Sequence, residues 1–446
     1  MRTKFSNIWL FLALGLTVAV FNSCNKDEGK PQVDSSGSFS KARIKDAKVL
    51  FINPSTLKSS DNGLLMKQMP DGSVEPVYFV LSNGDSLTCN TNEVISLNNE
   101  WIMLSGNYSV SHENYKYLFV NKNTETILGS SDFGFHYWSY LQYKDAYSDA
   151  TGAVYLPTVD NLYKFNLNAA GNATAEKYLP DGEFGYGVNF FVVSKEGICA
   201  YAQIQESHQQ AYSNIRFKLP SGKIVIMAQD FIRQNYTSDY ISDSFIYDRS
   251  GDMQIFTDKN GKMYIQALFA NTNHNFSFAI FRIDLSNNQL QYTKVAEKEV
   301  PNTNTSAIPS VGQLLVNPKK GTVMGGFFAT YGNDSNGIFE FDGNEIQYTF
   351  TGNSFFNCTN FTANYLVDIE NKKALNLNTY QEVGIQTDSR YDIKEYSFSR
   401  YSDNYSCKAL EYETGKTGIL ECSVTGGILS FTPIENGQNI TLSRIN

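Results

Sequence analysis

The feature of this chain that most constrains its fold is a recurring unit of strand, polar turn and strand. In each copy, apolar and polar residues alternate on both sides of a short turn containing Gly, Asn or Asp, which is the pattern of a β-hairpin. Seven copies start about 45 to 70 residues apart. They are Leu64–Val77, Tyr115–Leu128, Asn161–Leu179, Asn214–Met227, Phe278–Val295, Gly337–Phe350 and Lys408–Glu421.

Apolar runs between the hairpins predict a second type of strand. Val188–Ser194, Ile198–Gln203 and Gly325–Thr330 are nearly continuous in apolar residues, as expected for strands buried on both faces. Hairpins repeated at this interval with buried strands between them favour a β-propeller, a ring of four-stranded antiparallel blades. A two-sheet sandwich or a pair of β-domains is the alternative.

One segment resembles a turn-and-strand sequence motif found in many propeller families. In Thr257–Ala267, Asp258 is placed to accept turn amides and Gly261 to take a positive φ, just before an apolar strand. We therefore predict an all-β chain with a β-propeller over residues 42–446. Seven blades are favoured and six to eight remain open, because Asn364–Val383 predicts an extra hairpin.

Composition agrees with strands and limits the chemistry. Aromatic residues make up 14% of the chain, with 31 Phe and 28 Tyr, which suits pleated sheets. The net charge of −9 carries no basic cluster, so we expect no nucleic-acid partner. Only 4 His occur and no cysteines have metal-ligand spacing, so we expect no metal and no cofactor.

The N-terminus has the three parts of a secretory signal peptide. Arg2 and Lys4 provide the positive region, Ile8–Phe21 the apolar region, and the small Ser23 precedes the expected cleavage point. The apolar region is shorter than the roughly 20 residues that a membrane-spanning helix needs. Residues 1–23 are therefore predicted to be a signal peptide.

A lipoprotein signal is indicated by the cysteine at the cleavage point. Phe21-Asn22-Ser23-Cys24 departs from the common pattern at Phe21 and Asn22, but the acidic Asp27-Glu28 follows at once. This combination resembles the surface lipoproteins of Bacteroidetes. The resemblance implies a lipid on Cys24 as the membrane contact, a flexible tether over residues 24–41, and an outer-membrane location, at the cell surface.

Two cysteines near the C-terminus form a candidate disulfide. If the last hairpin turns at Thr414 and Gly415, Cys407 lies opposite Cys422 and Lys408 opposite Glu421. An oxidising compartment then permits a bond between the two cysteines. Two reduced cysteines packed as small apolar residues are the alternative.

A dense aromatic run gives the candidate ligand site. Tyr137, Trp138 and Tyr140 are the residues we expect to stack on a sugar ring, although such rings also fill the gaps between blades.

Two functions follow from these observations. The favoured one is a non-catalytic binding or scaffold protein of the envelope, for glycan or a partner envelope protein, with no catalytic residues assigned. The alternative is a glycan-cleaving enzyme, which needs two carboxylates about 5 to 10 Å apart. Its candidate carboxylates are Asp132, Asp160, Asp230, Asp243 and Glu340.

Overall fold

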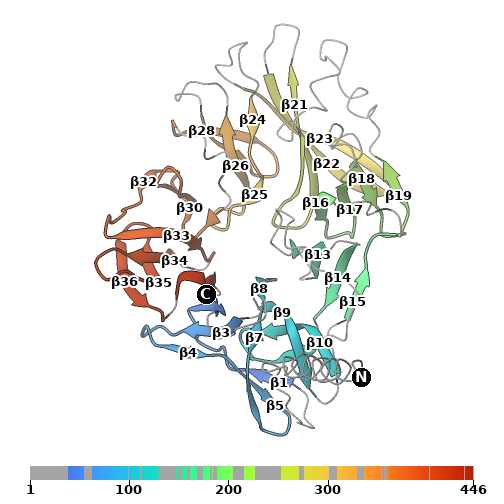
Figure 1. The fold of residues 1–446 in the computed structure, drawn as a ribbon. Coiled ribbons are helices and arrows are strands. Elements are labelled where there is room, and N and C mark those ends of the chain that lie inside the picture. Colours follow the sequence, from blue (N-terminus) through green and yellow to red (C-terminus); the bar gives the residue numbers. More distant parts are fainter. Residues whose placement is uncertain are drawn as a thin grey trace, which may run out of the picture.

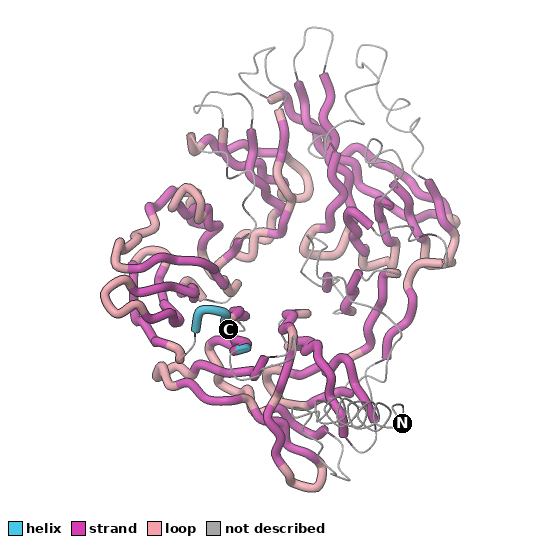
Figure 2. The backbone as a smooth tube through the Cα atoms, viewed as in Figure 1, coloured by secondary structure: helices cyan, strands magenta, loops and turns pink. Residues whose placement is uncertain are grey.

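The computed structural model consists almost entirely of short antiparallel strands, and Figure 2 shows them following one another around a ring. It describes residues 39–54, 63–98, 100–110, 113–129, 147–148, 153–157, 161–167, 174–180, 183, 188–203, 215–226, 253–270, 276–300, 309–328, 336–352, 355, 358, 360–400, 402–435 and 437–444. The signal peptide, Cys24 and most of the predicted tether lie outside these residues. No helix within the described ranges is long and apolar enough to cross a membrane.

Within the described residues, eight sheets of four or five strands succeed one another in the sequence, and a ninth has three. In order of pairing, the first four are β37 (Thr441–Arg444), β2 (Val49–Asn53), β3 (Gly63–Gln68), β4 (Val74–Pro76) with β7 (Asn90–Thr91); β8 (Glu93–Ser96), β9 (Trp101–Val110), β10 (Glu113–Asn121), β11 (Ile127–Gly129); β12 (Tyr147–Ser148), β13 (Val154–Pro157), β14 (Leu162–Asn166), β15 (Thr174–Lys177); and β16 (Val188–Val193), β17 (Cys199–Gln203), β18 (Ile215–Lys218), β19 (Ile224–Ile226).

The remaining sheets complete the ring in Figure 1. They are β20 (Met253–Thr257), β21 (Met263–Ala270), β22 (Phe276–Ser286), β23 (Gln289–Glu299); β24 (Ser310–Val311) and β25 (Leu315–Val316) beside β26 (Val323–Phe328), β27 (Gly337–Phe341), β28 (Ile346–Phe350); β29 (Asn360–Phe361), β30 (Tyr365–Asp368), β31 (Lys373–Asn376), β32 (Glu382–Gly384); and β33 (Tyr391–Ser397), β34 (Asn404–Glu411), β35 (Lys416–Ser423), β36 (Gly427–Pro433).

The two ends of the described chain meet in one sheet. The C-terminal strand β37 pairs with β2 near the N-terminus, and the register places Thr441 opposite Ile52 and Arg444 opposite Val49. Each of the other large sheets is built from consecutive strands, so this sheet alone among them joins distant parts of the sequence. The fold is therefore propeller-like, with the last strand closing the ring.

The hydrophobic core is divided among the gaps between neighbouring sheets. Ile198 and Phe217 of one sheet pack against Ile255 and Phe281 of the next, and equivalent clusters fill the other gaps. A further cluster, which includes Ile419 and two residues of β2, fills the gap between the β33–β36 sheet and the closing sheet. Both faces of most strands are thus buried, which explains the continuous apolar runs in the sequence.

A small three-stranded sheet braces the start of the ring. Its strands are β1 (Phe39–Ala42), β5 (Tyr78–Leu81) and β6 (Ser86–Thr88), and the β5–β6 hairpin interrupts the outer strand β4–β7 of the closing sheet. Leu65 bonds to both sides of the interruption: its carbonyl accepts from Val77 and its amide donates to the carbonyl of Cys89. β1 begins within the range predicted for the tether, so the boundary placed at residue 42 lies inside this strand.

The side chain of Glu125 attaches this brace to the next sheet. Its Oε1 accepts hydrogen bonds from the amides of Ile44 (3.0 Å) and Lys45 (2.8 Å), and its carbonyl accepts one from Ala42 at 2.9 Å. The N-terminal strand is therefore fastened to two sheets at once.

The hairpins predicted from the sequence are confirmed. Each of the seven units is observed as a pair of adjacent antiparallel strands, and Asn364–Val383 contributes the β29–β32 sheet. Asp258 accepts from the amides of Asn260 at 2.8 Å and Lys262 at 3.0 Å, and Gly261 has a φ of 75°, both as expected.

The register predicted for the last hairpin is wrong by two residues. The loop is Tyr412–Gly415, because the amide of Gly415 bonds to the carbonyl of Glu411 and Gly415 takes a φ of 67°. Cys407 consequently pairs with Leu420, and Tyr405 pairs with Cys422.

The cysteines are therefore diagonal neighbours on one face of the sheet, where Cα atoms are about 7 to 8 Å apart. Both thiols are buried and neither forms a disulfide, although a hydrogen bond joins the Cys407 and Cys422 side chains. The charge pair predicted with that register is also absent, since Lys408 lies opposite Ile419 and Ser406 opposite Glu421.

Strand alternation gives the ring two different ends. Connections between the second and third strands of a sheet, and from one sheet to the next, emerge at the same end, which we call the connection face. For example, β11 and β19 end at this face, and β12 and β20 begin there. The opposite end, which we call the turn face, has short turns such as Ser194–Ile198 and Asp258–Lys262.

Candidate functional site

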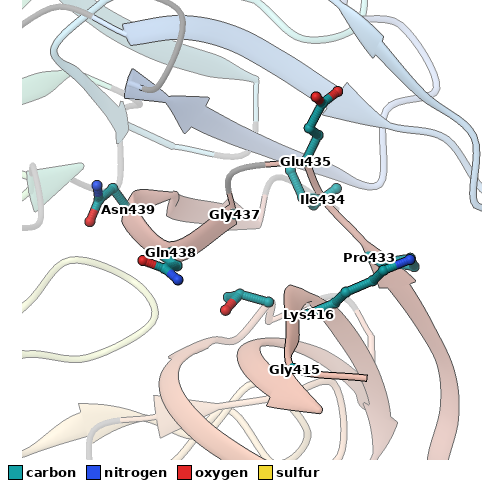
Figure 3. Close-up of a pocket in the computed structure, with 9 residues that line it drawn as sticks. Gly415, Lys416, Pro433, Ile434, Glu435, Gly437, Gln438 and Asn439 are labelled. Carbon is teal, nitrogen blue, oxygen red and sulfur yellow. The ribbon is translucent and has the colours of Figure 1, made fainter. Parts of the chain in front are cut away.

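A cavity of about 720 Å³ lies on the connection face, beside the seam where the ring closes. One wall is the start of β35 with the loop before it, and the other is the connection from β36 to β37, which contains the 3₁₀ turn η3 (Gly437–Asn439). Figure 3 shows these two segments facing each other across the cavity. The lining residues are Gly415, Lys416, Thr417, Pro433, Ile434, Glu435, Gly437, Gln438 and Asn439.

The two walls touch at the base of the cavity. The amide of Ile434 donates to the carbonyl of Thr417 at 3.0 Å, and η3 begins where Gly437 passes the same carbonyl. A Cβ atom on Gly437 would lie 2.7 Å from that oxygen, so only glycine permits this close approach. No sequence signal marks this segment as a site, because a short run of polar residues with one glycine is typical of any turn.

Four polar side chains of the lining are exposed: Lys416, Glu435, Gln438 and Asn439. In Figure 3, Gln438 points from η3 towards the opposite wall. None of the four makes a side-chain hydrogen bond or ion pair with another described residue. Together they offer two amides, an ammonium and a carboxylate, with Pro433 and Ile434 as an apolar patch.

A second polar cluster on the connection face is already internally paired. Glu183, in the connection that enters β16, forms an ion pair with Arg216 and accepts a hydrogen bond from the Tyr201 hydroxyl at 2.8 Å. Burial and the neighbouring carboxylate raise the pKa of Tyr201, which keeps its hydroxyl protonated as a donor. This arrangement ties a connection to its sheet and leaves the carboxylate occupied.

Glu340 is the one candidate catalytic carboxylate within the described residues, and it is fixed in a buried network on the turn face. Its oxygens accept from the Thr322 hydroxyl at 2.6 Å and from Lys320 at 3.4 Å. Lys320 also lies over the ring of Tyr380, with its Nζ 3.6 Å from the centroid. Burial first, and then Glu340, raise the pKa of Tyr380. The network joins two sheets and lies at the opposite end of the ring from the cavity.

The other predicted site residues lie outside the described residues. These are Cys24, Tyr137, Trp138, Tyr140, Asp132, Asp160, Asp230 and Asp243. In the sequence, the three aromatic residues lie between β11 and β12. Among the described residues, no group of three or more His, Cys, Asp or Glu is placed to hold a metal ion.

No protein-family model matches this chain, and no curated protein matches its sequence. Solved structures similar to it include virginiamycin B lyase from Staphylococcus aureus, with 17% identity, a TM-score of 0.34, and coverage of 65% of this chain and 83% of the lyase.

The Cps50 (Swd1) β-propeller domain of Myceliophteria thermophila has 8% identity and a TM-score of 0.32, over 84% of this chain and 97% of that domain. The periplasmic gluconolactonase PpgL of Pseudomonas aeruginosa has 12% identity and a TM-score of 0.26, over 94% and 92%. Similarity at this level does not bear on the activity of the present chain.

Proposed function

We propose that this protein is a lipid-anchored propeller of the bacterial envelope that binds glycan without cleaving it. The observation that carries the proposal is the cavity on the connection face, whose exposed polar side chains have no partner among the described residues. Amide side chains that are not already bonded suit a ligand rich in hydroxyl groups, because each amide both donates and accepts. We also propose that the eight larger sheets are the blades, one more than the seven favoured by the sequence.

The strands that flank the predicted aromatic residues in the sequence support the same face as the binding surface. Trp138 and its neighbours belong to a segment that begins and ends there, as do the other long connections. A ring with short turns at one end and long segments at the other is suited to recognition at the latter end.

Glycan binding is tested with the detergent-solubilised mature protein on an array of neutral and uronate-containing oligosaccharides. We expect binding to at least one class, weakened by Trp138→Ala. An array without any bound oligosaccharide would exclude the proposal. Release of reducing ends from the bound oligosaccharide would instead support the glycan-cleaving alternative.

Lipidation is tested separately at Cys24. We expect Cys24→Ala to abolish labelling by a fatty-acid probe and to leave an unlipidated precursor, because the thiol is the group that receives the lipid. Outer-membrane display is expected to be lost with it, as measured by protease accessibility on intact cells. Equal labelling of the variant and the wild type would contradict the assignment.

A further inference from the structure

The cavity lies beside the seam of the ring, and its two walls are the β33–β36 sheet and the connection that leads from this sheet towards β37. Gly415, Lys416 and Thr417 come from the β33–β36 sheet. The residues from Ile434 to Asn439 form the connection that leads directly into β37. A molecule that touches both walls therefore contacts the last complete sheet and the approach to the closing strand.

The approach to β37 is held by a few identifiable contacts. Ile440 is buried in one cluster with Ile419, and its carbonyl accepts a hydrogen bond from Lys408 at 3.0 Å. The side chain of Glu395 accepts from the amide of Leu442 at 3.4 Å. Asn53, at the end of β2, reaches the carbonyl of Glu435 at 3.5 Å. The two longest of these bonds are weak, so added contacts across the cavity would strengthen the seam.

The chemistry of the lining selects the ligand. Gln438 and Asn439 offer two primary amides, and Thr417 adds a hydroxyl. Pro433 and Ile434 add a small apolar surface of the size of a sugar's C–H face. Lys416 and Glu435 carry opposite charges, so the lining has no net charge, which favours a neutral saccharide over a strongly anionic one.

We propose that the seam cavity binds a neutral saccharide and that its occupation stabilises the closed ring. The inference rests on the proposed glycan binding and adds to it a location and a structural consequence. A ligand that bridges the two walls holds the connection in the position from which β37 pairs with β2, and it therefore favours the closed seam.

The test uses the oligosaccharide that binds best on the array, with the detergent-solubilised mature protein. Gln438→Ala and Asn439→Ala should each weaken binding about fivefold or more, since each loses hydrogen bonds to the ligand. Gln381→Ala is the matched control, because it removes an exposed amide from a turn on the turn face. Ligand should also slow amide hydrogen exchange in β37 and β2 more than in β21 and β22.

The outcomes separate this inference from the proposed function. Loss of binding in Trp138→Ala with unchanged binding in both seam variants would overturn the seam site and leave glycan binding intact. Protection spread evenly over all sheets would overturn the coupling to closure. Absence of binding by the wild-type protein would overturn both.

Discussion

At the scale of single residues, the recurring turns show one backbone requirement met by different side chains. Gly321 and Gly415 have φ angles of 68° and 67° at the last position of their turns, and each donates its amide to the carbonyl four residues earlier. Glu125 has a φ of 62° at the same position, which costs a non-glycine residue roughly 1 to 2 kcal/mol. Its carboxylate offsets this cost by holding the amides of Ile44 and Lys45.

Glu125→Ala should therefore lower the free energy of unfolding by about 1 to 3 kcal/mol, because the buried amide of Ile44 loses its acceptor. Glu125→Gln keeps one side-chain oxygen and should lose less. Chemical denaturation followed by tyrosine and tryptophan fluorescence measures both. Equal stability of the Ala variant and the wild type would show that the hydrogen bonds of the Glu125 carboxylate contribute nothing to the free energy of unfolding.

The thiols of Cys407 and Cys422 give a second prediction at this scale. The two residues are not paired directly across the ladder and form no disulfide, so both should be alkylated as separate peptides after unfolding without reductant. Burial raises the pKa of Cys199 to about 12, so that thiol should react slowly in the native state. A linked peptide carrying Cys407 and Cys422 would contradict the observed register.

At the scale of elements, the closing connection depends on one glycine. Gly437 passes the carbonyl of Thr417 so closely that a methyl group cannot be added without a shift of the backbone. This contact places η3, and hence β37, against the β33–β36 sheet.

Gly437→Ala should accordingly destabilise the protein by about 1 to 3 kcal/mol through overpacking. Gly384→Ala is the matched control, because a Cβ there meets no atom within 4 Å and should change stability by less than about 0.5 kcal/mol. Thermal unfolding of both variants measures the difference. Equal midpoints for the two variants would mean that the connection adjusts freely.

The elements also show how far the sequence predicts the fold. Hairpins such as Gly337–Phe350 are predicted because alternation and turn residues are local signals. The pairing of β37 with β2 has no local signal, since it depends on contacts between residues far apart in the chain. The register at Cys407 is not predicted correctly from the sequence. The position of the glycine within the four-residue loop sets the register, and a different position changes every residue pair along the ladder.

The candidate site was less predictable than the fold. Glu340 is a candidate catalytic residue because of its carboxylate, but the sequence carries no sign that Thr322, Lys320 and Tyr380 surround it. The seam cavity lies between two segments that become neighbours only when the β33–β36 sheet has formed.

At the scale of the whole molecule, the gaps between sheets contain many buried tyrosine hydroxyls. Burial raises the pKa values of Tyr264, Tyr292 and Tyr396 to about 12, above the ordinary value of 10.0 that applies to the unfolded chain. The folded state therefore favours the neutral phenol. This contribution to stability is fully present below pH 10 and is lost as the pH rises from 10 to 12.

The protein should thus lose stability in that alkaline interval, with tyrosinate absorbance appearing together with unfolding. Tyr292→Phe should keep its stability to higher pH than the wild type, because it has one ionisable phenol fewer in the core. Melting curves at increasing pH test this. Tyrosine ionisation that is complete near pH 10 with an intact fold would contradict it.

The closure of the ring by β37 also sets the order in which the molecule can be completed. A chain is made from its N-terminus, so β2 is present long before the strand that pairs with it. During that time β2 has one open edge, and the structure is an unfinished arc. Joining its ends brings together residues as far apart as Ile52 and Thr441, which makes this the slowest contact to form by chain diffusion. Assembly of the native ring therefore waits for the last residues of the chain, and any truncation at the C-terminus acts on the first sheet.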